Sequence, residues 1–215
     1  MTEWWSYRPS DFLMFSSRVY YRQIESYNIS LWPLHLLMLL VGIGLIWLLA
    51  RGRSNDSRLI AIVLAGLWLF VGWAYLWSRL SSINWAATYL AYGFAAQAIL
   101  MLAVLVFPRT IKNTSVRGSV GLALMAMAVL LYPGLAFFAG RGWGTAEVFG
   151  MMPDPTAVAS MGFLVSARHR YDFILFVIPT LWCVVSSTTL YTMAYPIWWF
   201  PFAMCVVGLA AAVAR

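Results

Sequence analysis

Few residues in this chain have side chains suited to chemistry, and those few are scattered along it. His35, Glu147 and Asp154 are of the types that ligate divalent metal ions or relay protons. None of them has a partner at the His-x-x-x-His or Glu-x-x-His spacing that places two ligands on one helix face. The candidate polar cluster, whose members are all expected near the outer face of the protein, comprises His35, Asn84, Tyr132, Glu147, Asp154 and Thr156.

Structural roles explain most of this outer cluster as well as chemistry does. Asp154 and Thr156 flank Pro155, and short polar side chains with a proline are typical of a helix N-terminus, where their oxygens cap free N–H groups. His35 follows Trp32 and Pro33 and needs only one hydrogen bond at a membrane surface. The sequence leaves metal binding open. It shows no catalytic spacing, so we expect no catalytic residues and no cofactor.

A second polar set falls at mid-membrane depth. Gln97 is the only amide near the middle of its apolar run, and Ser186 and Ser187 begin a hydroxyl-rich stretch in another. Such groups usually hydrogen-bond between membrane helices. The alternative is that they line a path for a small neutral solute.

The elements that must position these residues are apolar helices. The chain has 215 residues, of which 63% are hydrophobic and 10% charged, and its mean hydropathy is +0.80. Ordinary soluble domains have about 25% charged residues, so this composition excludes a soluble or a disordered protein. We predict an all-α polytopic membrane protein with seven transmembrane helices. The predicted spans are Ile29–Ala50, Leu59–Trp77, Trp85–Phe107, Gly118–Ala139, Pro155–Ala167, Phe173–Met193 and Ile197–Ala214.

The run Pro155–Ala167 is short for a membrane span, because a bilayer core needs about 20 helical residues. Six spans plus a re-entrant segment is therefore the alternative architecture. A full crossing is favoured because it keeps the connections rich in arginine on one side. No Lys, Arg, Asp or Glu falls inside any of the seven runs, so we expect an interior without the charged group that ion-driven transport needs.

The positive charges predict an orientation in the inner (plasma) membrane. Arginine and lysine concentrate in the connections 51–58, 108–117 and 168–172, which the positive-inside rule assigns to the cytoplasm. Seven crossings then place the N-terminus outside and Arg215 in the cytoplasm. The net charge of +7 reflects cations at membrane edges, where anionic lipid attracts them, and we expect no nucleic-acid partner.

Residues 1–28 form a separate segment in front of the bundle of residues 29–215. A helix from Ser10-Asp11 to Asn28 would place aromatic and aliphatic side chains on one half and Asp11, Arg18, Arg22 and Glu25 opposite them. This pattern predicts an amphipathic helix in the membrane interface. An anchor in the membrane plane is favoured over a docking face for a partner.

Short motifs of aromatic, proline and glycine residues are spread over nearly the whole chain. They are Pro9-Ser10-Asp11-Phe12, Tyr20-Tyr21-Arg22, Trp32-Pro33, Ile83-Asn84-Trp85-Ala86-Ala87, Phe149-Gly150, Pro155-Thr156 and Ile178-Pro179-x-Leu181-Trp182. In these motifs the chain resembles a family of small bacterial multipass membrane proteins that is catalogued only as a domain of unknown function. The resemblance implies an architecture and no activity. That family often has Cys and Thr where this chain has Asp154 and Ala157, so no thiol chemistry transfers to this site.

Three functions fit these observations. The favoured one is a non-catalytic membrane subunit or scaffold that associates with itself or with a larger membrane complex, such as a redox or oxygenase complex. Its packing face would use the small residues Gly208, Ala211 and Ala212. The second is a carrier or channel for a small neutral or metal solute. The third is a membrane enzyme or metal site at the outer face, so enzymatic activity is not excluded but is disfavoured.

Overall fold

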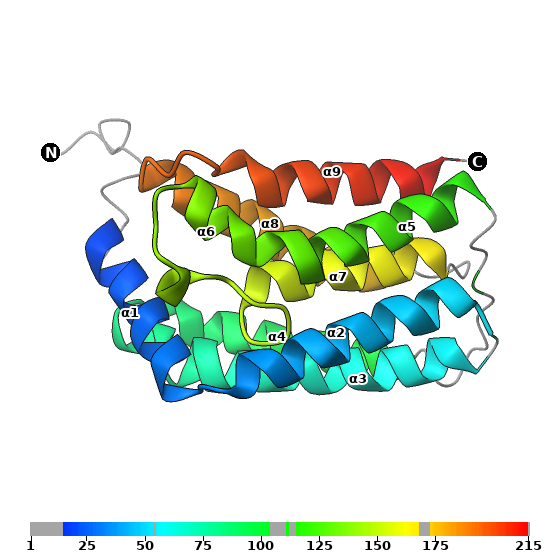
Figure 1. Cartoon of the computed structure of the whole chain (residues 1–215), viewed down its shortest axis with the longest axis horizontal. Coiled ribbons are helices and arrows are strands. Elements are labelled where there is room, and N and C mark those ends of the chain that lie inside the picture. Colours follow the sequence, from blue (N-terminus) through cyan, green and yellow to red (C-terminus); the bar gives the residue numbers. More distant parts are fainter. Residues whose placement is uncertain (1–14, 54, 104–110, 112–114, 168–172, 215) are drawn as a thin grey trace, which may run out of the picture.

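Within the described residues, each of the seven predicted apolar runs overlaps an α-helix, and the helices form one bundle (Figure 1). The computed structural model describes residues 15–53, 55–103, 111, 115–167 and 173–214, and these include no strand. The α-helices are α1 (Ser17–Ser30), α2 (Leu34–Arg51), α3 (Asp56–Val71), α4 (Ala86–Ala103), α5 (Val116–Ala126), α6 (Leu135–Phe138), α7 (Pro153–Ser166), α8 (Phe173–Thr192) and α9 (Trp199–Val213). Shorter helical turns are η3 (Gly72–Trp77), η4 (Leu80–Ser82), η5 (Met127–Leu131), η6 (Tyr132–Gly134) and η7 (Trp143–Thr145).

Successive helices run in opposite directions along the bundle (Figure 1). Helices α2, α4, α7 and α9 begin at the end of the bundle where α1 lies, which we call the α1 end. Helices α3, α5 with α6, and α8 return to it. At the opposite end, Gly52 (φ +66°) closes the turn between α2 and α3, and Arg51 binds Asp56 through Nη2–Oδ1 (2.5 Å) and Nε–Oδ2 (3.0 Å). The alternation follows from short connections between long helices.

Among the described residues, four helical segments are long and apolar enough to cross a membrane. They are Leu34–Arg51, Asp56–Ser82, Val116–Phe138 and Phe173–Thr192. Two shorter apolar helices, Ala86–Leu102 and Trp199–Val213, accompany them. The chain is thus an all-helical protein consistent with membrane insertion, and the predicted count of seven crossings stays a prediction.

Helix α7 occupies the centre of the bundle. All 14 of its residues are buried, so no side of this helix faces the exterior. Its first turn lies beside η6, and its last residue, Ser166, donates from Oγ to the carbonyl of Gly118 in α5 (3.3 Å). Helix α7 therefore extends along the core from the α1 end toward the opposite end.

Two glycines let α7 and α5 approach each other at backbone distance. A Cβ atom on Gly162 would lie 2.5 Å from the carbonyl oxygen of Gly121 and 2.8 Å from the amide nitrogen of Met125. A Cβ on Gly121 would overlap Gly162 O and Ser166 Oγ in the same way. Because the obstructing atoms include backbone atoms, no rotation of a side chain could relieve the overlap.

The small residue Gly208 of α9 is used inside the bundle. A Cβ there would meet Met161 Cε at 3.1 Å and Leu124 Cδ1 at 3.6 Å, so α9 packs closely on α7 and α5 at this point. The predicted packing face for a partner at Gly208, Ala211 and Ala212 is therefore wrong for Gly208. Small residues favour close helix contact, but the sequence does not say with which helix.

Helix α1 lies across the α1 end (Figure 1) and is tied to the loops there. Its described start is Ser17, with Ser16 as N-cap accepting from Val19 N, and the predicted start at Ser10-Asp11 lies outside the described residues. Ile24, Tyr27 and Asn28 are buried. The helix therefore caps the end of the bundle, and its inward face contacts protein.

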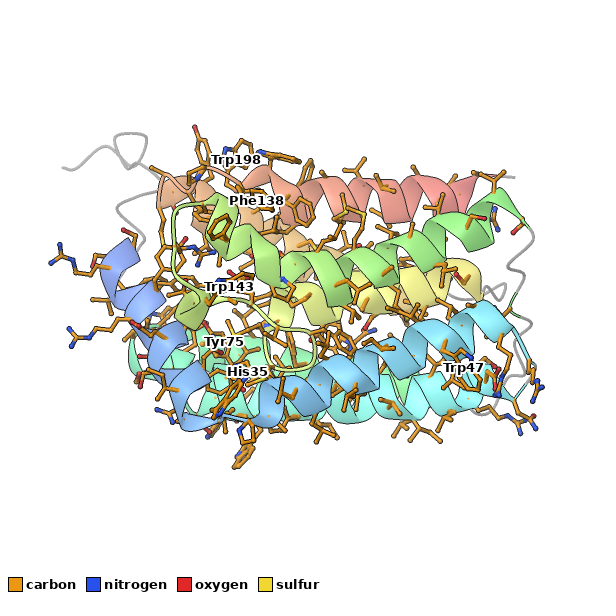
Figure 2. The ribbon with its side chains drawn as sticks, viewed as in Figure 1. His35, Trp47, Tyr75, Phe138, Trp143 and Trp198 are labelled. Atoms are coloured by element: carbon orange, nitrogen blue, oxygen red, sulfur yellow. The ribbon has the colours of Figure 1, made fainter. Side chains whose placement is uncertain are left out.

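The exterior of the bundle is apolar and has aromatic residues at both ends. Figure 2 shows Trp198, Phe138 and Trp143 toward the α1 end and Trp47 toward the opposite end, where the Arg51 guanidinium lies 4.3 Å from the Trp47 ring. Aromatic belts of this kind mark the two surfaces of a membrane. Large exposed side chains between them include Leu40, Ile43, Leu69, Ile99, Val184 and Val206.

Candidate functional site

The loop that joins α6 to α7 lies against α1. Two of its charged side chains, those of Arg141 and Glu147, are largely buried. Asn28 of α1 donates from Nδ2 to the carbonyls of Gly144 (2.8 Å) and Ala146 (2.9 Å). These bonds hold the loop segment on which Arg141 and Glu147 lie. Gly150 ends the loop with φ +74°, a conformation that glycine adopts without strain.

Asp154 joins three separate elements in the interior. Its Oδ1 accepts from Trp182 Nε1 (2.6 Å), and its Oδ2 accepts from Ser186 Oγ (2.7 Å) and Tyr132 Oη (3.0 Å). The residue is 5% exposed. Trp182 and Ser186 are in the middle of α8, so this carboxyl group lies well inside the bundle and does not cap α7.

The position of Asp154 corrects the expectation of an interior without a charged group. Sequence reasoning placed Asp154 in a connection because it precedes an apolar run. In the structure it is in the first turn of the buried helix α7, where three hydrogen-bond donors surround it. A carboxylate can be buried at tolerable cost when several donors satisfy its oxygens.

Arg141 is held between two aromatic rings. Its guanidinium carbon lies 4.2 Å from the centroid of Tyr21 and 4.6 Å from that of Tyr195, and Nη2 donates to Tyr195 Oη at 2.6 Å. The same Nη2 lies 3.7 Å from Glu147 Oε1, a loose ion pair. Cation–π contacts and this ion pair thereby connect α1, the α6–α7 loop and the turn before α9.

Glu147 is the most electrostatically perturbed group of this site outside the helices. Burial and, to a smaller extent, the nearby Asp154 raise the pKa of Glu147 to about 8, with Arg141 opposing the shift. A small cavity of about 10 Å³, the size of one water molecule, lies beside it. Its lining includes Tyr132, Arg141, Glu147 and Tyr195. The arrangement can therefore bind a water molecule or a proton.

Comparison with known proteins gives this chain a family but no activity. A family model described as "Family of unknown function (DUF6064)" matches residues 17–215. The chain is a member of DUF6064. The match confirms the resemblance to a family of unknown function. No curated protein and no solved structure matches the chain.

The structure of this DUF6064 member brings part of the predicted outer cluster together. Tyr132 and Asp154 are hydrogen-bonded, and Glu147 lies near enough for Asp154 to perturb its pKa. Ser186, predicted as a separate mid-membrane residue, joins them through Asp154. Thr156 stays local, accepting from Gly150 N (3.0 Å) and donating to the carbonyl of Met152 (2.8 Å).

The other predicted residues lie apart from this group. Asn84 Oδ1 accepts from Ala86 N (3.1 Å) at the start of α4, a capping role. His35 packs beside Trp32, with ring centroids 5.8 Å apart, and its Nδ1 has no hydrogen-bond partner. Within the described residues, no three His, Cys, Asp or Glu side chains are grouped to hold a metal ion.

The residues predicted at mid-membrane depth also have different partners. Gln97 is fully buried in α4 and donates from Nε2 to the carbonyl of Leu175 in α8 (3.0 Å), which is the bond between helices that the sequence favours. Its Oε1 and Ser187 Oγ are buried without a hydrogen-bond partner.

Sequence reasoning missed Arg141, Tyr21, Tyr195 and Trp182 as members of this site. One signal was present for Arg141, because it is one of few cations in the connections assigned to the outer side. The aromatic residues gave no such signal, since Tyr and Trp are common at membrane surfaces for reasons unrelated to a site.

Proposed function

We propose that this protein is a non-catalytic subunit or scaffold of the membrane, which associates with other membrane proteins or with a second copy of itself. The observation that carries the proposal is the fully buried helix α7. It fills the axis of the bundle, where a carrier or channel would need a path. Polar side chains of α7 are used in contacts between helices, such as Ser160, whose Oγ accepts from Trp68 Nε1 of α3 (2.9 Å).

The lipid bilayer is the first proposed partner. The four candidate spans and the apolar exterior support insertion in a membrane, and we propose the inner (plasma) membrane from the loop charges. The described parts of α1 and α9 end at opposite ends of the bundle (Figure 1), which agrees with an N-terminus outside and a C-terminus in the cytoplasm.

The face formed by α8 and α9 is the surface we propose for a protein partner. A groove of about 330 Å³ lies there, lined by Val184, Ser187, Thr188, Tyr191, Trp198 and Phe202. Tyr191 is 58% exposed and Phe202 47% exposed, so the groove walls face outward. A groove with mostly apolar walls suits a helix of a neighbouring membrane protein, whose side chains would fill it by van der Waals packing.

Site-specific photocrosslinking in native membranes tests this proposal. The variant Val184→p-benzoylphenylalanine places the probe at the groove, and Ile99→p-benzoylphenylalanine, on the exposed side of α4, is the matched control. We expect a discrete crosslinked protein, or a crosslinked dimer, from the groove position only. A free monomer after gentle solubilisation, with equal crosslinking from both positions, would contradict the proposal.

Transport measurements address the carrier alternative. If the chain moves a small solute through Gln97, purified protein in liposomes should take up that solute and Gln97→Leu should abolish uptake. The packed core around α7 predicts instead that liposomes with this protein are no more permeable to small neutral solutes than protein-free liposomes.

A further inference from the structure

The buried site at the α1 end contains two carboxyl groups and one guanidinium group. The side chains of Glu147 and Arg141 are 8% and 12% exposed, and Asp154 is 5% exposed. With all three ionised, the site would carry one uncompensated negative charge, which is costly away from water. Among the described residues, the other titratable groups that face the site are neutral near pH 7 in their ordinary state. They are Tyr20, Tyr21, Tyr75, Tyr132, Cys183 and Tyr195.

The hydrogen bonds assign the negative charge to Asp154. Trp182 Nε1 is a donor only, so Oδ1 of Asp154 must accept there. Tyr132 and Ser186 each direct a hydroxyl at Oδ2. The free N–H groups in the first turn of α7 add a favourable field. A carboxyl group with three donors is stabilised in its ionised form.

Among the described residues, Glu147 has no comparable set of donors. Its polar contact is Arg141, whose Nη2 lies 3.7 Å from Glu147 Oε1, and it borders the water-sized cavity. We propose that Glu147 binds one exchangeable proton, which makes the site neutral against Asp154 and Arg141, and that a water in the adjoining cavity delivers and removes it. On release, the Glu147 O–H bond breaks, the proton passes to the water, and the remaining carboxylate faces Arg141.

Electrostatics supports this assignment. Burial, followed by the negative charge of Asp154, raises the pKa of Glu147 to about 8, so the proton is bound at neutral pH and lost in mildly alkaline solution. The inference goes beyond the proposed subunit function and does not depend on any partner. At this proton-binding site, Arg141 also contacts Tyr21 of α1.

Infrared difference spectroscopy of the purified full-length chain tests the proposal. Between pH 6 and pH 10, about two units either side of the Glu147 pKa, we expect loss of a protonated-carboxyl band with a midpoint near 8. The variant Glu147→Gln should lack this band, and Glu25→Gln, at an exposed position of α1, should keep it. A band that survives in Glu147→Gln and disappears in Asp154→Asn would place the proton on Asp154 and overturn the proposal.

Two further variants give shifts of opposite sign, which a purely structural role of Glu147 would not produce. Asp154→Asn removes a negative neighbour and should lower the midpoint by at least about one pH unit, whereas Arg141→Gln removes a positive neighbour and should raise it. Arg141→Lys keeps the positive charge, so its titration midpoint should stay close to that of the unsubstituted protein. Circular dichroism confirms that each variant folds, and an unchanged midpoint in both folded charge variants would contradict the inference.

Discussion

At the scale of single residues, the interior polar groups of this protein act mainly as connections between helices. Asp154 links α7 to η6 and α8, Ser160 links α7 to α3, and Gln97 links α4 to α8. Each bond is made where water is absent, so loss of one member leaves a buried group without a partner. The interior polar residues therefore specify which helices are neighbours.

The bond from Trp182 to Asp154 gives a direct test of this role. Trp182→Phe keeps an aromatic ring against Phe94, whose centroid is 5.2 Å away, but removes a donor to a buried carboxylate. We expect a loss of about 1.5–3 kcal/mol in the free energy of unfolding, the usual cost for a hydrogen bond to a charged group. Trp73→Phe, at a position 66% exposed, is the control and should change the free energy by less than about 0.5 kcal/mol. Equal effects of the two substitutions would show that the bond does not matter.

At the scale of elements, the contact between α5 and α7 is the one where glycines bring two helix backbones closest together. Gly121 and Gly162 face each other, and the last turn of α7 meets the first turns of α5 through Ser166. Helices of this kind approach closely because a glycine has no Cβ, and the approach increases van der Waals contact along both backbones.

Substitution of Gly162 should therefore separate these two helices. Gly162→Ala places a methyl group 2.5 Å from a backbone oxygen, and we expect destabilisation of at least about 1–3 kcal/mol, typical of overpacking. Gly66→Ala in α3 is the matched control, because no atom lies within 4 Å of its Cβ position. The control should be neutral or stabilising by up to about 1 kcal/mol through helix propensity. Thermal unfolding of the two purified variants distinguishes these outcomes, and a stable Gly162→Ala protein would contradict the packing described here.

The two hydrogen bonds of Asn28 hold the end of α1 on the α6–α7 loop, and we expect their loss to loosen α1 without unfolding the bundle. Asn28→Ala removes both bonds to the carbonyls of Gly144 and Ala146. We expect faster hydrogen exchange in α1 and in residues 140–147, with unchanged exchange in α3 and α7, because local opening needs less free energy than global unfolding. Ser26→Ala, at an exposed position of the same helix, should leave exchange unchanged. Uniformly faster exchange in Asn28→Ala would show that α1 is part of the cooperative core.

At the scale of the whole molecule, alternating helix directions place α1 and the end of α9 at opposite ends (Figure 1). The arginines of the α2–α3 turn lie at the end away from α1. The positive-inside rule assigns that end to the cytoplasm. Orientation is therefore a property that charge and topology predict together.

Cysteine labelling of intact cells measures this orientation. Cys183 and Cys205 are both buried, so background labelling should be low. An impermeant thiol reagent should label Arg22→Cys in α1 from outside, whereas Arg58→Cys should react only after the membrane is made permeable. The reverse pattern would invert the proposed topology, and labelling of both from outside would contradict an alternating set of crossings.

Much of the fold follows from local sequence properties. Each apolar run of the sequence is helical because a backbone in an apolar environment must satisfy its own hydrogen bonds, whatever its neighbours are. The segment 155–167 shows the limit of this reasoning. Its composition matches a short span, but only the structure shows that it is α7, surrounded on all sides by other helices.

The candidate site was predictable only in part. Tyr132, Glu147 and Asp154 were chosen by residue type, and they do belong to one site. Arg141 and Trp182 were not found, because their contacts join positions far apart in the sequence, such as Arg141 and Tyr195, which are 54 positions apart. His35 and Asn84 were chosen by the same criteria and lie elsewhere, since residue type gives no distance.

The sequence by itself determined the class of the protein, the number of apolar helical runs and the sorting of most charges to their connections, because each depends on the free energy of transferring local segments out of water. Only the tertiary structure decided that Asp154 is an interior carboxyl group, that Gly208 contacts α7 and that α1 caps one end. These features depend on which helix faces lie against each other, and that choice is made by packing and by hydrogen bonds between residues distant in the chain.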